Sequence, residues 1–286
     1  MYACKKLNVE NQECCTIIVT ARYNGVDSYT SLCELLFNEL RFGACYIGVP
    51  GVFAIQATKR NFGIVVDIGA GYTNIVPIAH GYPMLANMKC LDIGGSDINK
   101  AYLDYIGADK FNDLEDIDKE LEKLKIDISK VSNKIIALQK EFKVVNYKLS
   151  NGVELELEKG EYMYAPEVLF SPEILGNDLD KNGVSGMIHK VIQSCPIDLR
   201  SELYMSVILT GSGSKLKGIG QRIRSDLRNL ASKEKDDVRV LVGDEHLAYV
   251  GAAKVANSSD FEYKLVTKQD FEEFGESVIR ERFFIG

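Results

Sequence analysis

The sequence contains no tryptophan, 6 prolines and only 3 histidines among its 286 residues. His80, His189 and His246 are too few and too far apart to suggest a zinc site. Lysine and arginine total 34 against 41 acidic residues, so the net charge is -7 and no basic field exists for nucleic-acid phosphates. No stretch approaches the roughly 18 to 20 apolar residues that a membrane-spanning helix needs. We therefore expect a soluble intracellular protein that contacts neither nucleic acid nor membrane directly.

Paired cysteines and nucleophile motifs are also missing. The seven cysteines form an odd, scattered set without a C-x-x-C pair, at positions 4, 14, 15, 33, 45, 90 and 195. This pattern indicates neither a disulfide framework nor a zinc knuckle, and it fits a reducing compartment. No G-x-S-x-G elbow is present and no cysteine has an obvious base beside it. Hydrolase chemistry therefore has no candidate nucleophile.

What the chain does have is enough apolar residues, 46%, to bury a sizeable core, which at this length predicts two lobes. Residues 16–24 and 45–55 are short apolar runs of strand type, and residues 28–40 between them have a helical pattern. This order predicts a β-α-β unit near the start of the chain.

The stretch "FGIVVDIGAGYTNIVPI", residues 62–78, predicts a glycine hairpin. Strands 62–68 and 72–78 can pair because Gly69 and Gly71 permit the positive φ of a tight turn. Asp67 could be a turn-capping residue or a metal ligand. We favour the cap, since a metal usually requires more than one carboxylate or phosphate ligand.

Residues 110–142 place apolar side chains at alternating spacings of three and four, which predicts one long helix, or two in line. Its narrow apolar stripe favours packing on a lobe over a coiled coil, although it could dock a partner helix. Residues 144–160 alternate apolar and polar about Asn151-Gly152, the commonest two-residue hairpin signal. An antiparallel hairpin is expected there.

The last third repeats the α/β theme. Residues 183–193 are helical in pattern, 205–210 are a buried strand, and "GSGSKLKG" is a glycine loop leading into a helix over 219–231. Neither glycine turn of the chain matches a Rossmann or Walker signature. Taken alone, each turn favours structural use of glycine over phosphate binding.

Taken together and in order, these motifs resemble the actin family over nearly the whole chain. The stretches that carry the resemblance are "GIVVDIGAGYTNIVPIAHGYP", "LDIGGSDINKAYL", "PEVLFSPEILG", "CPIDLRSELYMSVILTGSGSKLKGIGQRI" and "HLAYVGAAKV". The resemblance implies an α/β fold of two actin-like lobes, of the ribonuclease H and sugar-kinase type. It also implies an ATP cleft between the lobes, gripped by two glycine hairpins.

The resemblance further implies how the chain is divided. Residues 1–57 and 248–286 correspond to a remnant of the first large lobe, 58–93 and 180–247 to the second large lobe, and 94–179 to a small subdomain with the long helix and the hairpin. The family's N-terminal part, with its glycine hairpin and DNase-loop subdomain, has no counterpart here. Without that subdomain we expect no filament formation.

The family's nucleotide residues carry over only in part. The positions that match, as a degenerate nucleotide cleft, are Asp67, Gly69, Gly71, Thr73, Gly95, Glu122, Gly211 and Gly213. Four others depart from the pattern: Ala70 replaces an acid, Pro50 the water-positioning glutamine, Leu216 a tyrosine and Glu245 a lysine beside adenine. Proline has no amide with which to orient a nucleophile, and a carboxylate repels a nucleotide's charge. We expect no catalysis, no metal site and no cofactor, with ATP or ADP bound only if the cleft retains weak affinity.

Within the family, "LDIGGSDINKAYLDYI" and "SSDFEYKLVTKQDFEEFGESVIRERF" resemble the actin-related protein six subfamily. That resemblance implies a structural subunit of a nuclear chromatin-remodelling complex that exchanges a histone variant. The implied partners are a remodelling ATPase and a zinc HIT-finger subunit.

Two alternatives stay open: a cytoplasmic pointed-end actin-related subunit of dynactin, suggested by "CPIDLR", and an ATP-binding actin-like protein whose N-terminus is missing from the gene model. For the interaction subunit we expect an exposed apolar wall at residues 49–55 that a partner covers.

Overall fold

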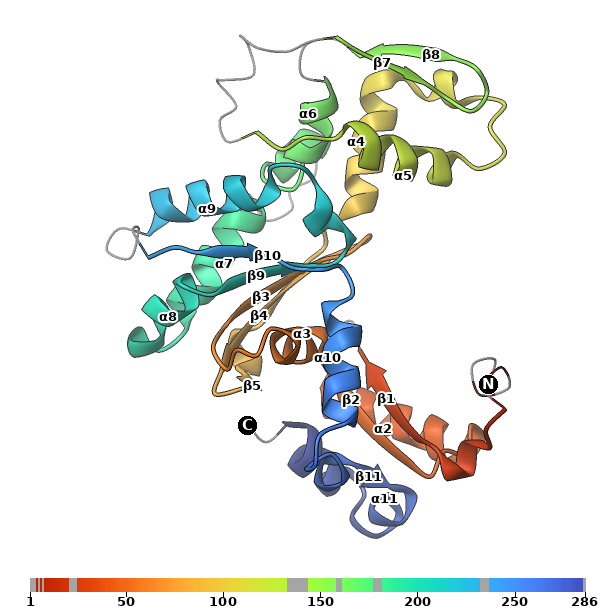
Figure 1. Cartoon of the computed structure of the whole chain (residues 1–286), viewed down its shortest axis with the longest axis vertical. Coiled ribbons are helices and arrows are strands. Elements are labelled where there is room, and N and C mark those ends of the chain that lie inside the picture. The colour runs from red at the N-terminus through yellow and green to blue at the C-terminus, as the bar shows by residue number, and fades with distance from the viewer. Residues whose placement is uncertain are drawn as a thin grey trace.

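The computed structural model describes the chain except residues 1–3, 5, 7, 21–24, 133–143, 158–160, 177–181, 232–236 and 285–286. Two sheets lie one above the other, and a helical subdomain with a hairpin caps the upper one (Figure 1). In the described residues no helix is long and apolar enough to cross a membrane. All seven cysteines carry free thiols.

The first lobe is built on a three-stranded sheet of order β1-β2-β11. Strands β1 (Cys15–Val19) and β2 (Ala44–Gly48) are parallel and are joined by helix α2 (Val26–Glu34), which confirms the predicted β-α-β unit. Strand β11 (Val266–Thr267) pairs antiparallel with β2, and helices α11 (Lys268–Phe274) and α12 (Glu276–Ile279) follow it.

The second lobe contains a six-stranded sheet of order β10-β9-β3-β4-β5, with β6 also paired to β4. The predicted hairpin is confirmed as β3 (Gly63–Ile68) and β4 (Thr73–Ala79), and β3 also pairs in parallel with β9 (Val207–Thr210). The remaining strands are β5 (Tyr82–Pro83), β6 (Lys89–Leu91) and β10 (Val240–Val242). Helices α7 (Gly183–Ser194), α8 (Arg200–Tyr204) and α9 (Ile219–Leu230) flank this sheet (Figure 1).

Two helices join the lobes by packing on each other. They are α3 (Pro50–Ala57) and α10 (Leu247–Ala256). Their backbones approach so closely that a Cβ on Gly251 would lie 1.7 Å from the Phe53 carbonyl oxygen, so only glycine fits at 251. Phe53, Ala54 and Ile55 are fully buried. The predictions of a strand through residue 55 and of an exposed wall at 49–55 are therefore wrong, because this segment is a helix covered by α10.

The small subdomain contains α4 (Gly95–Ile106), α5 (Ile117–Ile128), the strands β7 (Val145–Lys148) and β8 (Glu154–Leu157), and α6 (Glu161–Glu167). The β7–β8 hairpin is confirmed, and Gly152 in its turn has a φ of 89°.

A single long helix over 110–142 is wrong. The Asp116 side chain caps α5 by accepting from the Lys119 amide at 2.9 Å, and the helix ends at Ile128. The amide of Val131 instead donates to the Lys217 carbonyl, 2.7 Å away in another segment. The other alternative, two helices in line, stays a prediction, because its second helix would fall on residues 133–142, which lie outside the described residues.

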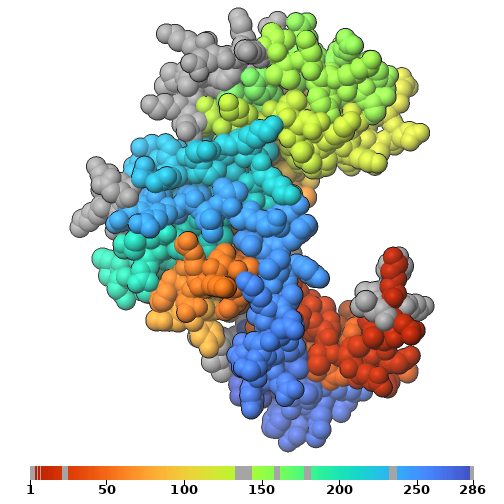
Figure 2. All heavy atoms as spheres, in the orientation of Figure 1, coloured from red at the N-terminus to blue at the C-terminus, as the bar shows by residue number. Residues whose placement is uncertain are grey.

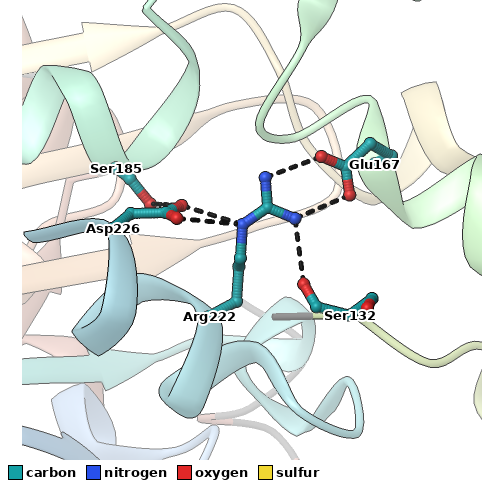
Figure 3. Close-up of polar contacts among 5 residues, drawn as sticks. All are labelled: Ser132, Glu167, Ser185, Arg222 and Asp226. Atoms are coloured by element: carbon teal, nitrogen blue, oxygen red, sulfur yellow. Dashed lines mark hydrogen bonds and ion pairs between the residues drawn. The ribbon is translucent and has the colours of Figure 1, made fainter. Parts of the chain in front are cut away.

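A buried ion network fastens α9 to α6 (Figure 3). Arg222 donates to both carboxylate oxygens of Glu167, at 2.8 and 2.7 Å, and its Nε donates to Asp226 at 2.9 Å. Ser185 donates to Asp226 as well, and the Arg222 guanidinium lies 4.4 Å from the Phe170 ring centroid. Because bidentate pairing satisfies a buried guanidinium, this cluster holds the small subdomain against the second lobe.

Candidate functional site

The turn of the β3–β4 hairpin forms the floor of the candidate site. The Gly69 amide closes the turn by donating to the Tyr72 carbonyl at 3.0 Å. Neither Gly69 nor Gly71 has a positive φ, so that part of the sequence prediction is wrong. The position near this turn that requires glycine is Gly94, where a Cβ would lie 2.5 Å from the Ala70 carbonyl oxygen.

The start of α4 lies directly against this turn. The Gly95 amide donates to the Gly69 carbonyl at 2.9 Å, and the Ser96 amide donates to the Ala70 carbonyl at 2.8 Å. These bonds bring Gly95 beside the hairpin glycines. Thr73 is fully buried and its hydroxyl donates to the Ile93 carbonyl at 2.8 Å, so it supports the turn from below.

The second glycine turn packs on the end of β3. Since β3 and β9 are parallel with Asp67 opposite Thr210, the residues that follow β9 come next to Asp67. Gly211 has a φ of 79°, and a Cβ there would lie 2.4 Å from Asp67 Oδ1. A Cβ on Gly213 would lie 2.3 Å from Ile68 Cγ2. Burial raises the pKa of Asp67, which disfavours its ionised form as a ligand.

Helix α5 contributes a polar cluster to the opposite wall. Glu122 accepts from Asn99 Nδ2 at 2.9 Å and from Lys125 Nζ at 2.5 Å. Lys125 is buried, and its ammonium also donates to the Gly95 carbonyl at 3.1 Å. Sequence reasoning missed Lys125, although its position three residues after Glu122 on one helix was a signal for the pair.

These elements enclose a cavity of about 230 Å³ between the small subdomain and the second lobe. Gly95, Glu122 and Gly213 of the predicted set line it, together with Lys125 and Leu216. At its rim Lys215 pairs with Glu245. The isolated carboxylate expected at Glu245 is therefore neutralised by a lysine that the sequence analysis did not use.

The predicted residues thus gather at one place, although they come from distant parts of the chain. Asp67, Gly69, Gly71 and Gly211 form the two turns beside the cavity, whereas Thr73 lies beneath. Pro50 is buried at the start of α3, and Ala70 is exposed on the hairpin turn.

Comparison with known proteins explains this arrangement. The family model for actin matches residues 1–284. The chain belongs to the actin family. Actin-related protein 2 of Saccharomyces cerevisiae is 27% identical over 280 residues, covering 90% of this chain and 70% of that protein. Centractin of the same yeast is 30% identical over 266 residues, covering 89% of this chain and 68% of centractin.

For an actin-family member, the cavity does not fit ATP. Its volume is below the roughly 300–1,000 Å³ of ordinary ligand pockets. Both of its lysines already have carboxylate partners, so neither cation is free for a phosphate. Within the described ranges, no group of three or more His, Cys, Asp or Glu side chains is placed to hold a metal ion. We therefore derive no step that involves a nucleotide.

Proposed function

We propose that this protein is a non-catalytic actin-related subunit that works by binding other proteins in a multi-subunit complex. The observation that carries the proposal is the cavity, whose charged side chains bond to one another. Lys125 ties α5 to the start of α4, and Lys215 ties the second glycine turn to Glu245. Since the chain itself supplies these bonds, the small subdomain can stay in place without a bound nucleotide.

The finer proposal is a nuclear chromatin-remodelling complex that exchanges a histone variant. It is supported by the resemblance of residues 91–106 and 258–283 to the actin-related protein six subfamily. The partners proposed on that basis are a remodelling ATPase and a zinc HIT-finger subunit. Loss of turnover chemistry does not remove the surfaces of an actin fold, so such a subunit keeps its docking role.

One specific feature favours a second candidate, a pointed-end subunit of dynactin. The stretch "CPIDLR" suits that group, and its Ile197 side chain is 79% exposed. An apolar side chain that exposed is available for a partner.

Affinity purification of the tagged chain from its own cells separates the two candidates. We expect a stoichiometric nuclear assembly that contains a large remodelling ATPase. Dynein-associated subunits in the eluate would instead favour the second candidate. Recovery of a free, cooperatively unfolding monomer would contradict both, because such a protein needs no complex.

Sequencing the 5′ end of the transcript tests the remaining alternative. An upstream D-N-G-x-x hairpin would revive nucleotide binding. We expect none.

A further inference from the structure

The two lobes are built from the same unit, used twice. In the first lobe the order is β1, α2, β2 and α3, and in the second lobe it is β9, α9, β10 and α10. Each unit has two parallel strands joined by a helix, followed by a helix that packs against its counterpart from the other unit. Strands β2 and β10 therefore occupy the same place, and the neighbours of one can be compared with those of the other.

In the first lobe, the outer edge of β2 is covered. Strand β11 pairs antiparallel with β2 on the side away from β1, with Val266 opposite Cys45 and Thr267 opposite Ala44. This short strand comes from a distant part of the sequence and reaches backbone groups that β1 does not reach. The first lobe thus shows which kind of neighbour fits at this position of the unit.

In the second lobe, the outer edge of β10 is bare. Strand β10 ends its sheet, and among the described residues no strand pairs with its other side. Arg239 and Gly243 bond to β9, through the Arg239 carbonyl at 3.1 Å and the Gly243 amide at 2.9 Å. Because alternate residues of a strand direct their backbone groups to opposite sides, Val240 and Val242 direct theirs to the bare edge. Figure 2 shows α9 and β10, in shades of blue, side by side at the surface.

The side chains of this edge strand are apolar and accessible. Leu241 is 40% exposed and Val242 is 47% exposed. A Cβ on Gly220 of α9 would lie 2.7 Å from Val242 Cγ2, so Val242 faces α9 and Leu241 faces the opposite side. Proteins protect a free edge with charged residues or proline on the strand itself, whereas all three residues of β10 are aliphatic. The edge therefore offers apolar contacts on both faces of the sheet.

Arginines gather at the N-terminal end of β10. The Nε atom of Arg224 on α9 donates to the Val238 carbonyl at 3.2 Å, and because this carbonyl points away from β9, the guanidinium lies at the bare edge. Arg228 lies one turn later on the same side of α9, Arg239 directly precedes β10, and all three arginines are exposed. Within the described ranges none of the three has a carboxylate partner. Asp237 opposes them with a single negative charge, so positive charge is in excess at this end of the strand.

We propose that an extended, acidic segment of a partner subunit adds to β10 as an antiparallel strand, with carboxylates near its C-terminal end beside Arg224 and Arg239. The inference rests on the proposed function and names one surface by which the subunit binds its complex. An extended strand is the occupant because bare backbone groups on a sheet edge are satisfied by strand addition. Its antiparallel direction follows from β11 beside β2. Its acidic character follows from the arginines, which carboxylates satisfy through charge-assisted hydrogen bonds.

A second copy of this chain fits the edge less well. Two β10 strands could pair antiparallel about a two-fold axis, but each offers only three extended residues, far less surface than a stable dimer buries. The acid that would then come nearest to Arg239 is Asp244, and its carboxylate already accepts from the His246 amide at 2.8 Å. A helix does not fit either, since it has no free backbone groups to pair with Val240 and Val242.

The test uses the complex purified from cells with the tagged full chain. In wild-type protein, amide hydrogen exchange over residues 238–243 should be slower in the complex than in the free chain, because the Val240 and Val242 amides gain acceptors. A photo-crosslinking phenylalanine analogue at position 241 should link to an acidic, extended segment of a partner subunit. Equal exchange in both states, or crosslinks to a helical segment, to nucleic acid, to a second copy or to another part of this same chain, would overturn the inference.

A pair of double variants tests the charge. Arg224→Glu with Arg239→Glu should reduce the recovered partner by about tenfold or more, because like charges then face each other across the interface. Lys100→Glu with Lys123→Glu is the matched control: it changes the net charge equally at exposed residues of the small subdomain and should recover the partner at near wild-type yield. Near wild-type recovery by the arginine variant would contradict an acidic partner segment.

The remaining outcomes separate this inference from the proposed function. If the arginine variant lowers the melting temperature of the free chain more than the lysine variant does, the wild-type exchange and crosslinking results decide. If a complex forms but exchange over 238–243 is unchanged, this inference fails and the proposed function stands. If the wild-type chain recovers no complex, the proposed function fails and this inference fails with it.

Discussion

Strands β1 and β9 occupy the same place in two copies of one structural unit, yet their environments differ. Strand β9 lies between β3 and β10 and is buried throughout, whereas β1 has a single neighbour among the described strands and its end residues Cys15 and Val19 are exposed. The same local pattern of apolar runs joined by a helix produced both parallel pairs. What differs is the strand added from elsewhere in the sequence. The comparison teaches that the second lobe is self-sufficient on the β3 side of β9 because strands from elsewhere in the sequence complete its sheet there, whereas no such strand lies beside β1 among the described residues.

The largest loss of stability in the second lobe is expected when its buried arginine is replaced. The Arg222→Ala variant leaves the Glu167 carboxylate buried without its cation, which should lower the free energy of unfolding by about 3–5 kcal/mol. Denaturant unfolding followed by circular dichroism measures the change. The exposed pair Lys148–Glu154, 4.0 Å apart, is the control: Lys148→Ala should cost less than about 1 kcal/mol. Equal losses in the two variants would show that burial does not set the strength of these pairs.

Truncating one isoleucine side chain in each of the strands β9 and β1 should have the next largest effect on stability. Ile208 of β9 is fully buried, so Ile208→Ala should lower the unfolding free energy by about 2–5 kcal/mol. Ile17 of β1 is only partly buried, and Ile17→Ala should cost clearly less in the free chain. A larger loss of unfolding free energy for Ile17→Ala than for Ile208→Ala would contradict the difference in burial between the two strands.

The cavity lysine should have a smaller effect. Lys125→Ala removes the bonds to Glu122 and the Gly95 carbonyl, which should lower the unfolding free energy by about 1.5–3 kcal/mol. Lys123, exposed on the same helix, gives the control variant Lys123→Ala, expected within about 0.5 kcal/mol of wild type. Saturating ADP should leave the difference between the two variants unchanged. Restoration of Lys125→Ala stability by the nucleotide would argue that the site still accepts one.

The exposed face of α10 should affect solubility more than stability. Tyr249→Ser with Val250→Thr removes apolar surface, so the soluble yield of the free chain should rise while its melting temperature changes little. Sedimentation of lysates and thermal unfolding check the two parts. If the wild-type chain is already soluble and the double variant gives no higher soluble yield, the exposed apolar face of α10 does not limit solubility, which would contradict this prediction.

Local patterns predicted the elements whose hydrogen bonds stay within a few residues or one β-α-β unit. The hairpin of residues 62–78 and the β1–β2 pair are of this kind. The single helix over 110–142 was wrong because its apolar spacing continues past Ser129, where the backbone instead bonds to Tyr162 and Lys217 of distant segments. Periodicity carries no information about such contacts.

The candidate site was predictable as a set of glycines and acids but not as a structure. The resemblance named Glu122 and Glu245, and the lysines that neutralise them became visible only when α5 and the second glycine turn were placed around one cavity. Burial of residues 49–55 likewise depends on α10, which lies about two hundred residues later in the chain.

Isothermal titration calorimetry of the 286-residue chain with magnesium and ATP tests the central claim most directly. With the cavity lysines already paired, the account predicts no saturable heat with ATP at tens of micromolar. A one-to-one isotherm with micromolar affinity would contradict it, because that affinity corresponds to about -8 kcal/mol of binding that these residues do not provide.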